Sequence, residues 1–476
     1  MIMKNILFLI NLSLLAATQP DIFYSGYIDF AYISRLSDKS LINIPYRMAS
    51  INFDSQMENL SINGNFSLEY HVRDDAYFLG SSNPQDFILD MRELYLTHSG
   101  DNYEFRIGKQ IHSWGNVDEN SPVDNASALD YYYMFFGGTE RKMATLSTAL
   151  DYYFGPLKLN GVFSPLHATN RIPLGDDDFP IRLPVYPDES EIYPITGLPY
   201  EAGIHGTLST DLGDFSASYF SGYDRTFNLT GINVYGRGSD ISFPHVDIVY
   251  GYRQTNVVGL GFTFLNDLFT LRSDLGYFST KDKNSSIDRE SSYISSIYDS
   301  LHLSYPLLEK AEYLQSTFQI ETELPFDINI TIQHFMHDTL SYSSDSLPID
   351  QEIDIPNLQI DPEEMTPSNF FTPGMGVPLA ILTKKAFLLI MDRSFFDDRL
   401  KVAYTSMMDI ASYENISGVS GSLSELRLEY TMTTNLEGLI SITKVSGSND
   451  HPDGDNYPFK RMEDFSHIRF ELKYFF

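Results

Sequence analysis

The end of the chain alternates between apolar and charged side chains. Apolar residues hold one set of alternate positions and charged residues hold the other. Successive side chains of a β-strand point to opposite faces, so this segment predicts a strand with one apolar and one charged face. Such a strand fits a soluble sandwich or a barrel. The run reads His467-Ile468-Arg469-Phe470-Glu471-Leu472-Lys473-Tyr474-Phe475-Phe476.

The same alternation recurs in at least three earlier segments, 314–321, 327–333 and 425–432. Repeated segments of about ten residues with an apolar and a polar face are typical of transmembrane β-barrels. A closed barrel is one of the two structures that can satisfy every backbone hydrogen-bonding group within lipid. The repeats therefore favour an all-β, antiparallel transmembrane barrel over a sandwich.

The connections between these segments alternate between short and long. Pairing each short turn with its flanking strands predicts about eighteen strands, with sixteen as the alternative. An even number places both termini in the periplasm and makes the long, acidic loops extracellular. The short turns are Ser99-Gly100-Asp101, Gly155-Pro156, Leu212-Gly213-Asp214, Asn266-Asp267, Leu324-Pro325 and Thr434-Asn435. The long segments lie near 114–140, 166–199, 224–252, 281–309, 339–379 and 447–463.

The N-terminus has the three parts of a secretory signal. Lys4 is followed by an apolar run over 5–15 and by Ala16-Ala17. The run is shorter than the roughly 20 residues that a spanning helix needs. We therefore expect a cleaved signal peptide over 1–17 and one barrel domain over 18–476.

Four apolar residues of the final strand suggest how an exported barrel reaches its membrane. A C-terminal Phe preceded by apolar residues at steps of two resembles the signal by which outer-membrane barrels are recognised for insertion. The resemblance implies an outer-membrane location, contact with outer-membrane lipids and recognition by the barrel-insertion machinery. The residues concerned are Phe470, Leu472, Tyr474 and Phe476.

Composition excludes several functions. The net charge of −32 argues against nucleic acid, because phosphate binding needs a basic surface. The absence of Cys excludes disulfides and thiolate metal sites. The sequence contains no metalloprotease, serine-hydrolase or phosphate-loop motif, so we expect neither enzymatic activity nor a cofactor.

The acidic loops have two interpretations. The stretch 345–364 contains seven acids and no Lys or Arg, and 450–456 has closely spaced oxygens around Gly454. The simpler interpretation is solvated loops that repel one another. The alternative is binding of divalent cations between loops, or a cation preference at the pore mouth.

The region 90–140 is the most informative about the barrel interior. If the hairpin turns at Gly100, residues whose numbers sum to about 202 face each other. Asp90 then meets His112, and Arg92 meets Gln110, on a face that also carries His98. We expect this face to line the lumen. Glu104 and Arg106 belong to the same face.

Two features of this region need a further explanation. Glu93 would meet Lys109 on the lipid-facing side of the hairpin. Either the two charges neutralise each other there, or a bulge at Gly108 turns Lys109 inward, and we prefer the bulge.

Residues 115–140 form a candidate constriction loop that places acids opposite Arg92 and Arg106. Facing charges of this kind would sort solutes, whereas the alternative is that they only brace the interior. The acids are Asp118, Glu119, Asp124 and Asp130.

Several motifs together resemble a known group of proteins. Gly108-Lys109-Gln110, then Trp114-Gly115 and an acidic loop, resemble the uncharacterised Gram-negative outer-membrane barrels related to alginate-export porins. The segments 199–204, 217–225 and 257–262 continue the resemblance, so it covers about 90–265. Ala128-Leu129-Asp130 departs from it, because the family usually has Asn-Pro before the Asp. The resemblance implies an outer-membrane channel, sometimes paired with lipid or polymer export. Trp114 is expected to be a membrane-interface anchor or a packing residue.

Three functions remain open. The first is a porin-like channel for passive passage of small or polymeric solutes with a cation preference, because no segment before the first strand is long enough for a plug domain. The second is an outer-membrane partner in lipid or polysaccharide export, bound to a periplasmic component through the short turns. The third is a structural or adhesive surface barrel. Monomer and trimer remain equally open, because a subunit contact would be apolar like any lipid-facing surface.

Overall fold

The computed structural model describes most of the chain. The described ranges are 21–71, 87–136, 140–172, 198–237, 240–284, 300–344, 371–412 and 418–476, with the separate residues 178–179, 192, 195, 287, 354–355, 358–359 and 416. The predicted signal peptide over 1–17 and most of the acidic stretch 345–364 lie outside these residues.

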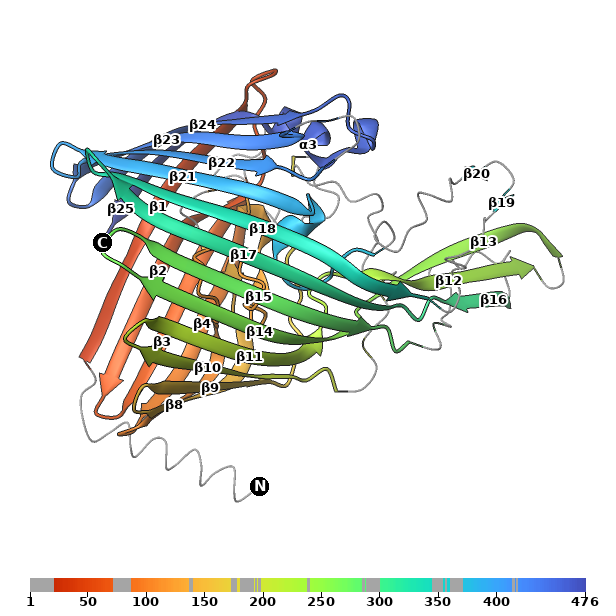
Figure 1. The fold of residues 1–476 in the computed structure, drawn as a ribbon, viewed down its shortest axis with the longest axis horizontal. Helices are drawn as coiled ribbons and strands as arrows, with labels where there is room; N and C mark the ends of the chain where they lie inside the picture. The colour runs from red at the N-terminus through yellow and green to blue at the C-terminus, as the bar shows by residue number, and fades with distance from the viewer. Residues whose placement is uncertain are drawn as a thin grey trace.

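Eighteen antiparallel strands form one closed barrel in chain order (Figure 1). The prediction of an all-β barrel with eighteen strands is confirmed. The strands are β1 (Asp21–Arg35), β2 (Pro45–Met57), β3 (Leu60–His71), β4 (Phe87–Ser99), β5 (Tyr103–Gln110), β8 (Thr145–Phe154), β9 (Leu157–Ser164), β10 (Glu201–Thr210), β11 (Gly213–Tyr223), β14 (Gln254–Leu265), β15 (Thr270–Lys281), β17 (Lys310–Leu324), β18 (Ile328–Ser343), β21 (Lys385–Phe395), β22 (Leu400–Asp409), β23 (Gly421–Thr433), β24 (Leu436–Gly447) and β25 (His467–Phe475).

The first and last strands close the barrel. β1 pairs with β25 from Tyr27 opposite Phe475 to Arg35 opposite His467. The backbone N–H of Gly26 donates to the carbonyl of Phe476 at 2.9 Å, which extends the pairing to the C-terminal residue. Closure leaves no unpaired sheet edge, which is what a barrel in lipid requires.

The two ends of the barrel differ in their connections. Eight hairpins of two to four residues lie at one end, here called the turn end, together with the start of β1 and the C-terminus (Figure 1). All six predicted short turns are among them, and Gly155 has φ of 55° in the two-residue turn Gly155-Pro156, a conformation that Gly adopts without strain. The long connections lie at the opposite end, the loop end.

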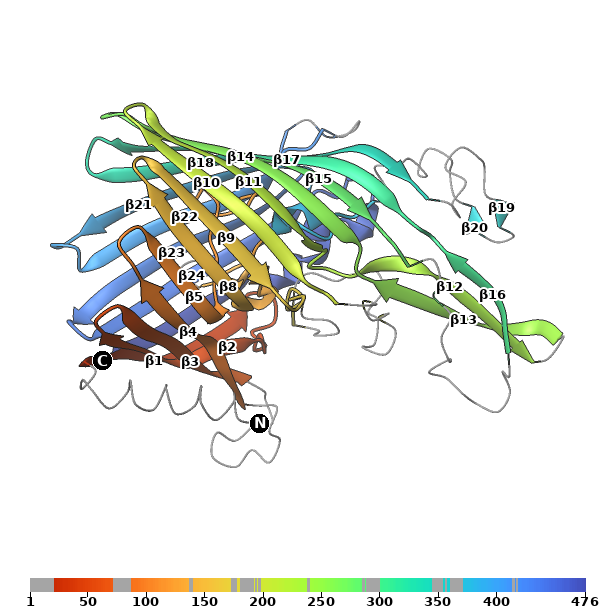
Figure 2. The same ribbon diagram turned by 90° about the horizontal axis from the view of Figure 1, so that it is seen from below.

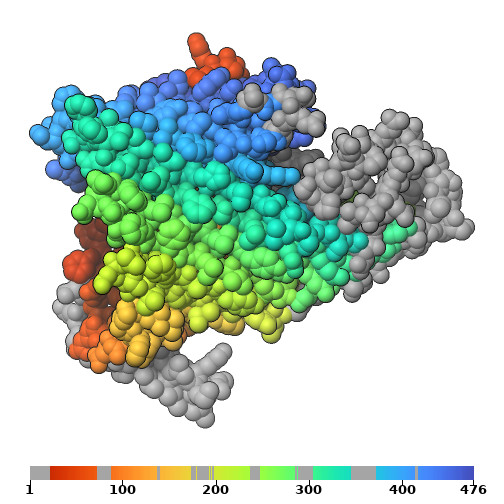
Figure 3. Space-filling model, in the orientation of Figure 1, coloured from red at the N-terminus to blue at the C-terminus, as the bar shows by residue number. Residues whose placement is uncertain are grey.

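The two faces of the wall differ in polarity. Leu426, Leu428 and Tyr430 of β23 are 44%, 39% and 44% exposed on the outer face, whereas Glu425 and Arg469 are buried on the inner face. The strands form a continuous outer wall in the space-filling view (Figure 3). A soluble monomer rarely exposes so much apolar surface, so the wall is that of a transmembrane barrel.

Three strands between β11 and β17 lie outside the barrel. They form a separate antiparallel sheet that projects from the loop end (Figure 2). They are β12 (Asn228–Arg237), β13 (Asp240–Gly251) and β16 (Ser300–Pro306), with β12 in the centre. Two of them, β12 and β13, lie in the region 225–255, whose poorly defined pattern, with that of the first hairpin, left sixteen strands as the alternative.

The remaining elements are short and lie in the long connections. In the part of the chain that the structure describes, no helix has the length and hydropathy to cross a bilayer. The elements are the two-residue strands β6 (Ala128–Leu129), β7 (Lys142–Met143), β19 (Asp354–Ile355) and β20 (Leu358–Gln359), the helix α3 (Pro458–Arg461), and 3-10 turns at Tyr131–Tyr133, Pro378–Ile381, Gly454–Asn456 and Glu463–Phe465.

The apolar core of the molecule lies inside the barrel. Phe135 and Phe136 from the connection after β5 pack with Phe465 from the connection after β24 at ring-centroid distances of 5.9 and 6.0 Å. Val377 and Leu379 from the connection after β18 belong to the same cluster. Side chains from several long connections thus fill part of the lumen.

Candidate functional site

Residues 111–136 and 140–144, here called the inner loop, fold into the lumen and are fixed to the far wall. The buried carboxylate of Asp274 on β15 accepts hydrogen bonds from the backbone N–H groups of Asn116 and Val117 at 2.8 and 3.1 Å. It also accepts the hydroxyl of Ser121 at 2.7 Å. Hydrogen bonds to a charged group each contribute about 1.5–3 kcal/mol, so this carboxylate is a strong attachment point.

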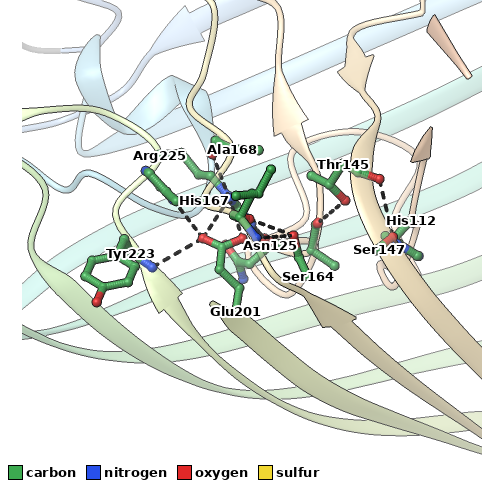
Figure 4. A network of polar contacts seen from close by, with 12 residues as sticks. His112, Asn125, Thr145, Ser147, Ser164, His167, Ala168, Glu201, Tyr223 and Arg225 are labelled. Atoms are coloured by element: carbon green, nitrogen blue, oxygen red, sulfur yellow. Dashed lines mark hydrogen bonds and ion pairs between the residues drawn. The ribbon is translucent and has the colours of Figure 1, made fainter. Parts of the chain in front are cut away.

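A second set of contacts holds the inner loop to the wall of β8 to β11 (Figure 4). The buried Arg225 donates to Glu201 at 2.8 Å and to the carbonyl of Asn125 in the inner loop at 2.8 Å. His112, at the start of the loop, lies 2.8 Å from the hydroxyl of Ser147 on β8. The inner loop is therefore attached both to β15 and to the wall of β8 to β11, and these contacts fix its position in the lumen.

The inner loop leaves a cavity on the opposite side of the lumen. This cavity has a volume of about 550 Å³ and lies along the seam where the barrel closes. Its wall comes from β1, β2, β3, β4, β24 and β25, and Tyr133, Phe136 and Glu140 of the inner loop form part of its lining. We call it the seam cavity.

Nine ionisable acids and bases line the seam cavity. Lys473 pairs with Asp29 at 3.3 Å across the β1–β25 seam, and Arg469 pairs with Glu471 at 3.5 Å. The five acids are Asp29, Glu93, Glu140, Glu437 and Glu471, and the four bases are Arg47, Arg92, Arg469 and Lys473.

A smaller cavity of about 310 Å³ continues from the seam cavity toward the turn end. Asn52, Asn65 and Glu93 line both cavities, so the two adjoin. Asp54 and Asn63 extend the polar lining on β2 and β3. Together the cavities form a polar path along the inner wall of β1 to β4.

The predicted register of the β4–β5 hairpin is wrong by one residue. Leu94 faces Lys109 and Thr97 faces Arg106, so opposite residues sum to 203 and not to about 202. The pairing ends at Leu94, and Asp90 and Arg92 do not meet His112 and Gln110. His98 faces the exposed Phe105 and therefore lies on the outer face, not in the lumen.

The bulge lies on a different strand from the one expected. β5 pairs continuously through Gly108, whereas β4 has a register shift between Met91 and Glu93, opposite Asn65 and Phe66 of β3. Lys109 stays at an outward position, and its ammonium reaches Asp90 at 3.3 Å. Neither the inward turn of Lys109 nor its neutralisation by Glu93 is found. The sequence of the β4–β5 hairpin does not reveal this register shift, because the shift arises in the pairing of β4 with β3.

Gly108 has a different structural role. Its φ is 140°, and a Cβ there would collide with the carbonyl oxygen of Leu94. A side chain at this position would therefore disturb the pairing that positions the end of β5 and the start of the inner loop.

Four further candidates lie on or next to β5. Arg106 forms ion pairs with Asp151 at 2.6 Å and with Glu104 at 3.3 Å. Gln110 is buried and donates to the carbonyl of Ser147 at 3.1 Å. Arg106 and Glu104 therefore brace β5 against β8, whereas Gln110 and His112 attach the start of the inner loop to β8. None of the four lines either cavity.

The four acids of the inner loop find basic partners other than Arg92 and Arg106. Asp118 pairs with Arg272 of β15 and also accepts from Gln319 at 2.7 Å. Two further pairs are Glu119 with Arg141 at 3.2 Å and Asp124 with Lys142.

Asp130 is the fourth of these acids. It forms an ion pair with Arg171 at 3.1 Å and accepts the N–H of Tyr132 at 3.1 Å. Burial raises the pKa of its carboxyl above the usual value, against the opposing effect of Arg171. The predicted arrangement of these acids facing Arg92 and Arg106 is therefore not found. Among the ten candidate pore-lining residues, Arg92 lines the seam cavity.

Trp114 is buried inside the barrel, which is at odds with an anchor at the membrane interface. Its indole stacks on His205 at 5.7 Å and donates to Asn160 at 2.8 Å. The neighbouring Gly115 lies close to Ser121, where a Cβ would collide. Both residues shape the inner loop.

Sequence reasoning missed most of the residues that line the seam cavity. Arg469, Glu471 and Lys473 occupy the charged positions of the terminal strand, so their inward direction was readable from the alternation. Asp29 on β1 and Glu437 on β24 lie opposite Lys473 in the strand register, one on each side of β25. The seam cavity lies beside these strands because the inner loop packs against the opposite wall. The local sequence pattern does not show where the inner loop packs.

Possible divalent-cation sites can be judged for part of the chain. Within the described ranges, no group of three or more His, Asp or Glu residues is placed to hold a metal ion. The loop at 450–456 is among the residues described, and most of the stretch 345–364 is not.

Comparisons with known proteins give matches in structure only. No protein-family model matches the chain, and no curated protein sequence does. Among solved structures, the chain is similar to OccAB4 of Acinetobacter baumannii, with 13% identity over 96% of this chain and 98% of the other and a TM-score of 0.47. OpdK of Pseudomonas aeruginosa with vanillate matches at 11% identity over 96% and 98%, with a TM-score of 0.48. A BenF-like porin from Pseudomonas fluorescens matches at 11% over 96% and 98%, with a TM-score of 0.44. The barrel of this chain is established by its own strand pairing.

Proposed function

We propose that this protein is a passive outer-membrane channel for small solutes. The observation that carries the proposal is the polar path of two adjoining cavities inside a closed barrel with an apolar outer wall. A lumen lined by charged groups and walled off from lipid supports passage of hydrophilic solutes. Two more specific predictions belong to this proposal. The first is a relationship to the alginate-export porins, and the second is the passage of polymeric solutes.

We also propose a preference for cations. Five acids and four bases line the seam cavity, and the whole chain has a net charge of −32. Glu437 is a wall acid with no ion pair to a described base. An excess of negative charge raises the local concentration of cations and lowers the barrier to their passage.

The test is ion conductance of the purified protein in planar bilayers under a KCl gradient. We expect single-channel currents and a reversal potential of the sign for K⁺ selectivity, which Glu437→Gln should reduce. The matched control is Asp392→Asn, because Asp392 pairs with Lys401 and lines neither cavity. No conductance above leak would overturn the channel, and anion selectivity would overturn the cation preference.

A further inference from the structure

Among the residues that the structure describes, Arg92 has no carboxylate partner, unlike the other bases of the seam cavity. Each of the other three forms an ion pair, at 3.6 Å for Arg47, 3.5 Å for Arg469 and 3.3 Å for Lys473. Among the described residues, Arg92 makes one hydrogen bond, from Nη2 to the carbonyl of Lys142 at 3.1 Å. Its guanidinium therefore retains donors for a group that enters the cavity.

Glu140 lies next to Arg92 and lacks a basic partner among the described residues. Its Oε1 accepts the backbone N–H of Lys142 at 2.8 Å, so both side chains are held by the same residue of β7. The N–H and C=O of one extended residue point to the same side of a strand. Arg47 fixes this segment further by donating to the backbone carbonyl of Glu140 at 2.8 Å.

The contacts with Lys142 hold the charged groups of Arg92 and Glu140 near each other without direct contact between them. No oxygen of Glu140 lies within 4.0 Å of a nitrogen of Arg92, so the two do not form an ion pair. Both line the seam cavity. A solute with one charge would meet one attractive and one repulsive group, whereas a solute with both charges would satisfy both.

We infer that Arg92 and Glu140 form a binding subsite for a zwitterion with closely spaced charges, such as an α-amino acid. The carboxylate of the solute binds the Arg92 guanidinium, and its ammonium binds the Glu140 carboxylate. The inference rests on the proposed function for the route by which the solute arrives. The cavity of about 550 Å³ is within the usual range for small-molecule sites.

The test is calorimetric titration of the full chain in detergent with three probes of similar size. L-Alanine has both charges, propionate has the carboxylate alone and ethylamine has the ammonium alone. We expect alanine to bind at least about tenfold more tightly than either single-charge probe. Arg92→Gln and Glu140→Gln should each abolish this advantage, and Asp392→Asn should leave it unchanged.

Alanine binding no tighter than propionate or ethylamine would overturn the inference, and so would an advantage that survives both substitutions. The ranking of probes on the unmodified protein decides the question even where a variant fails to fold. Because binding is measured without a membrane, missing conductance would overturn the channel and leave the subsite standing. A conducting protein that does not prefer alanine would overturn the subsite alone.

Discussion

At the scale of single residues, Asp282 shows how burial sets a response to pH. It directly follows β15 at the loop end, and its carboxylate accepts the N–H of Asn284 at 2.8 Å. Burial raises the pKa of Asp282 to about 6, and the nearby Glu309 acts in the same direction. The hydrogen bond from Asn284 and the charge of Arg253, which pairs with Asp224 and Glu309, lower the pKa and offset part of this effect.

We predict that Asp282→Asn stabilises the protein at pH 7 and not at pH 4. The folded state holds the proton of Asp282 up to about pH 6, whereas the unfolded chain releases it near the ordinary aspartate pKa of 3.8. The free energy of unfolding therefore falls as pH rises from about 4 to about 6 and stays lower above that range. The expected gain at pH 7 is on the order of 2 kcal/mol, measured by urea denaturation.

The control for this prediction is Asp38→Asn. Hydrogen bonds from Ser40 lower the pKa of the fully exposed Asp38, so the same substitution there should give no stabilisation at pH 7. An equal effect of Asp282→Asn at pH 7 and pH 4 would contradict the assignment.

At the scale of elements, strands were predictable and their exact pairing was not. The alternation of β23 and β25 could be read from the sequence because period-two patterning is local. The predicted register of β4 against β5 was wrong, because β4 has a register shift between Met91 and Glu93 where it pairs with β3. Arg272, the basic partner of the inner-loop acid Asp118, lies about 150 residues away in the sequence and leaves no local signal.

We predict that Asp274→Ala releases the inner loop from β15. The substitution removes the acceptor of four hydrogen bonds, two from Asn116 and one each from Val117 and Ser121. Each of them contributes about 1.5–3 kcal/mol. Single-channel recordings should show larger and noisier currents, and limited proteolysis should cut within 116–121. Asp392→Asn is again the control. Recordings that match the unmodified protein would show that Asp274 does not hold the loop.

At the scale of the whole molecule, the barrel depends on a single long-range pairing. β1 and β25 lie at opposite ends of the sequence, and without their contact both β1 and β25 would be sheet edges. Open edges are not tolerated in lipid. The overall architecture was nevertheless predictable, because short turns and alternating segments recur along the chain.

We predict that removal of residues 467–476 abolishes the folded barrel, whereas Phe476→Ala affects assembly in cells alone. The backbone bonds between Phe476 and Gly26 do not need the ring, so this variant should refold in detergent as the unmodified chain does. In cells, we expect at least about a tenfold loss of the heat-modifiable, protease-resistant form, through lost recognition by the insertion machinery. Equal losses in cells and in detergent would indicate a purely structural role for the ring.

The position of the seam cavity has a consequence for biogenesis. Its wall includes both the first barrel strand and the last, so the cavity is complete only after β25 has paired with β1. Contacts of such high sequence separation form late, because a long loop must close first. A partly assembled barrel therefore has a gap in its wall at the place where the finished molecule has the cavity.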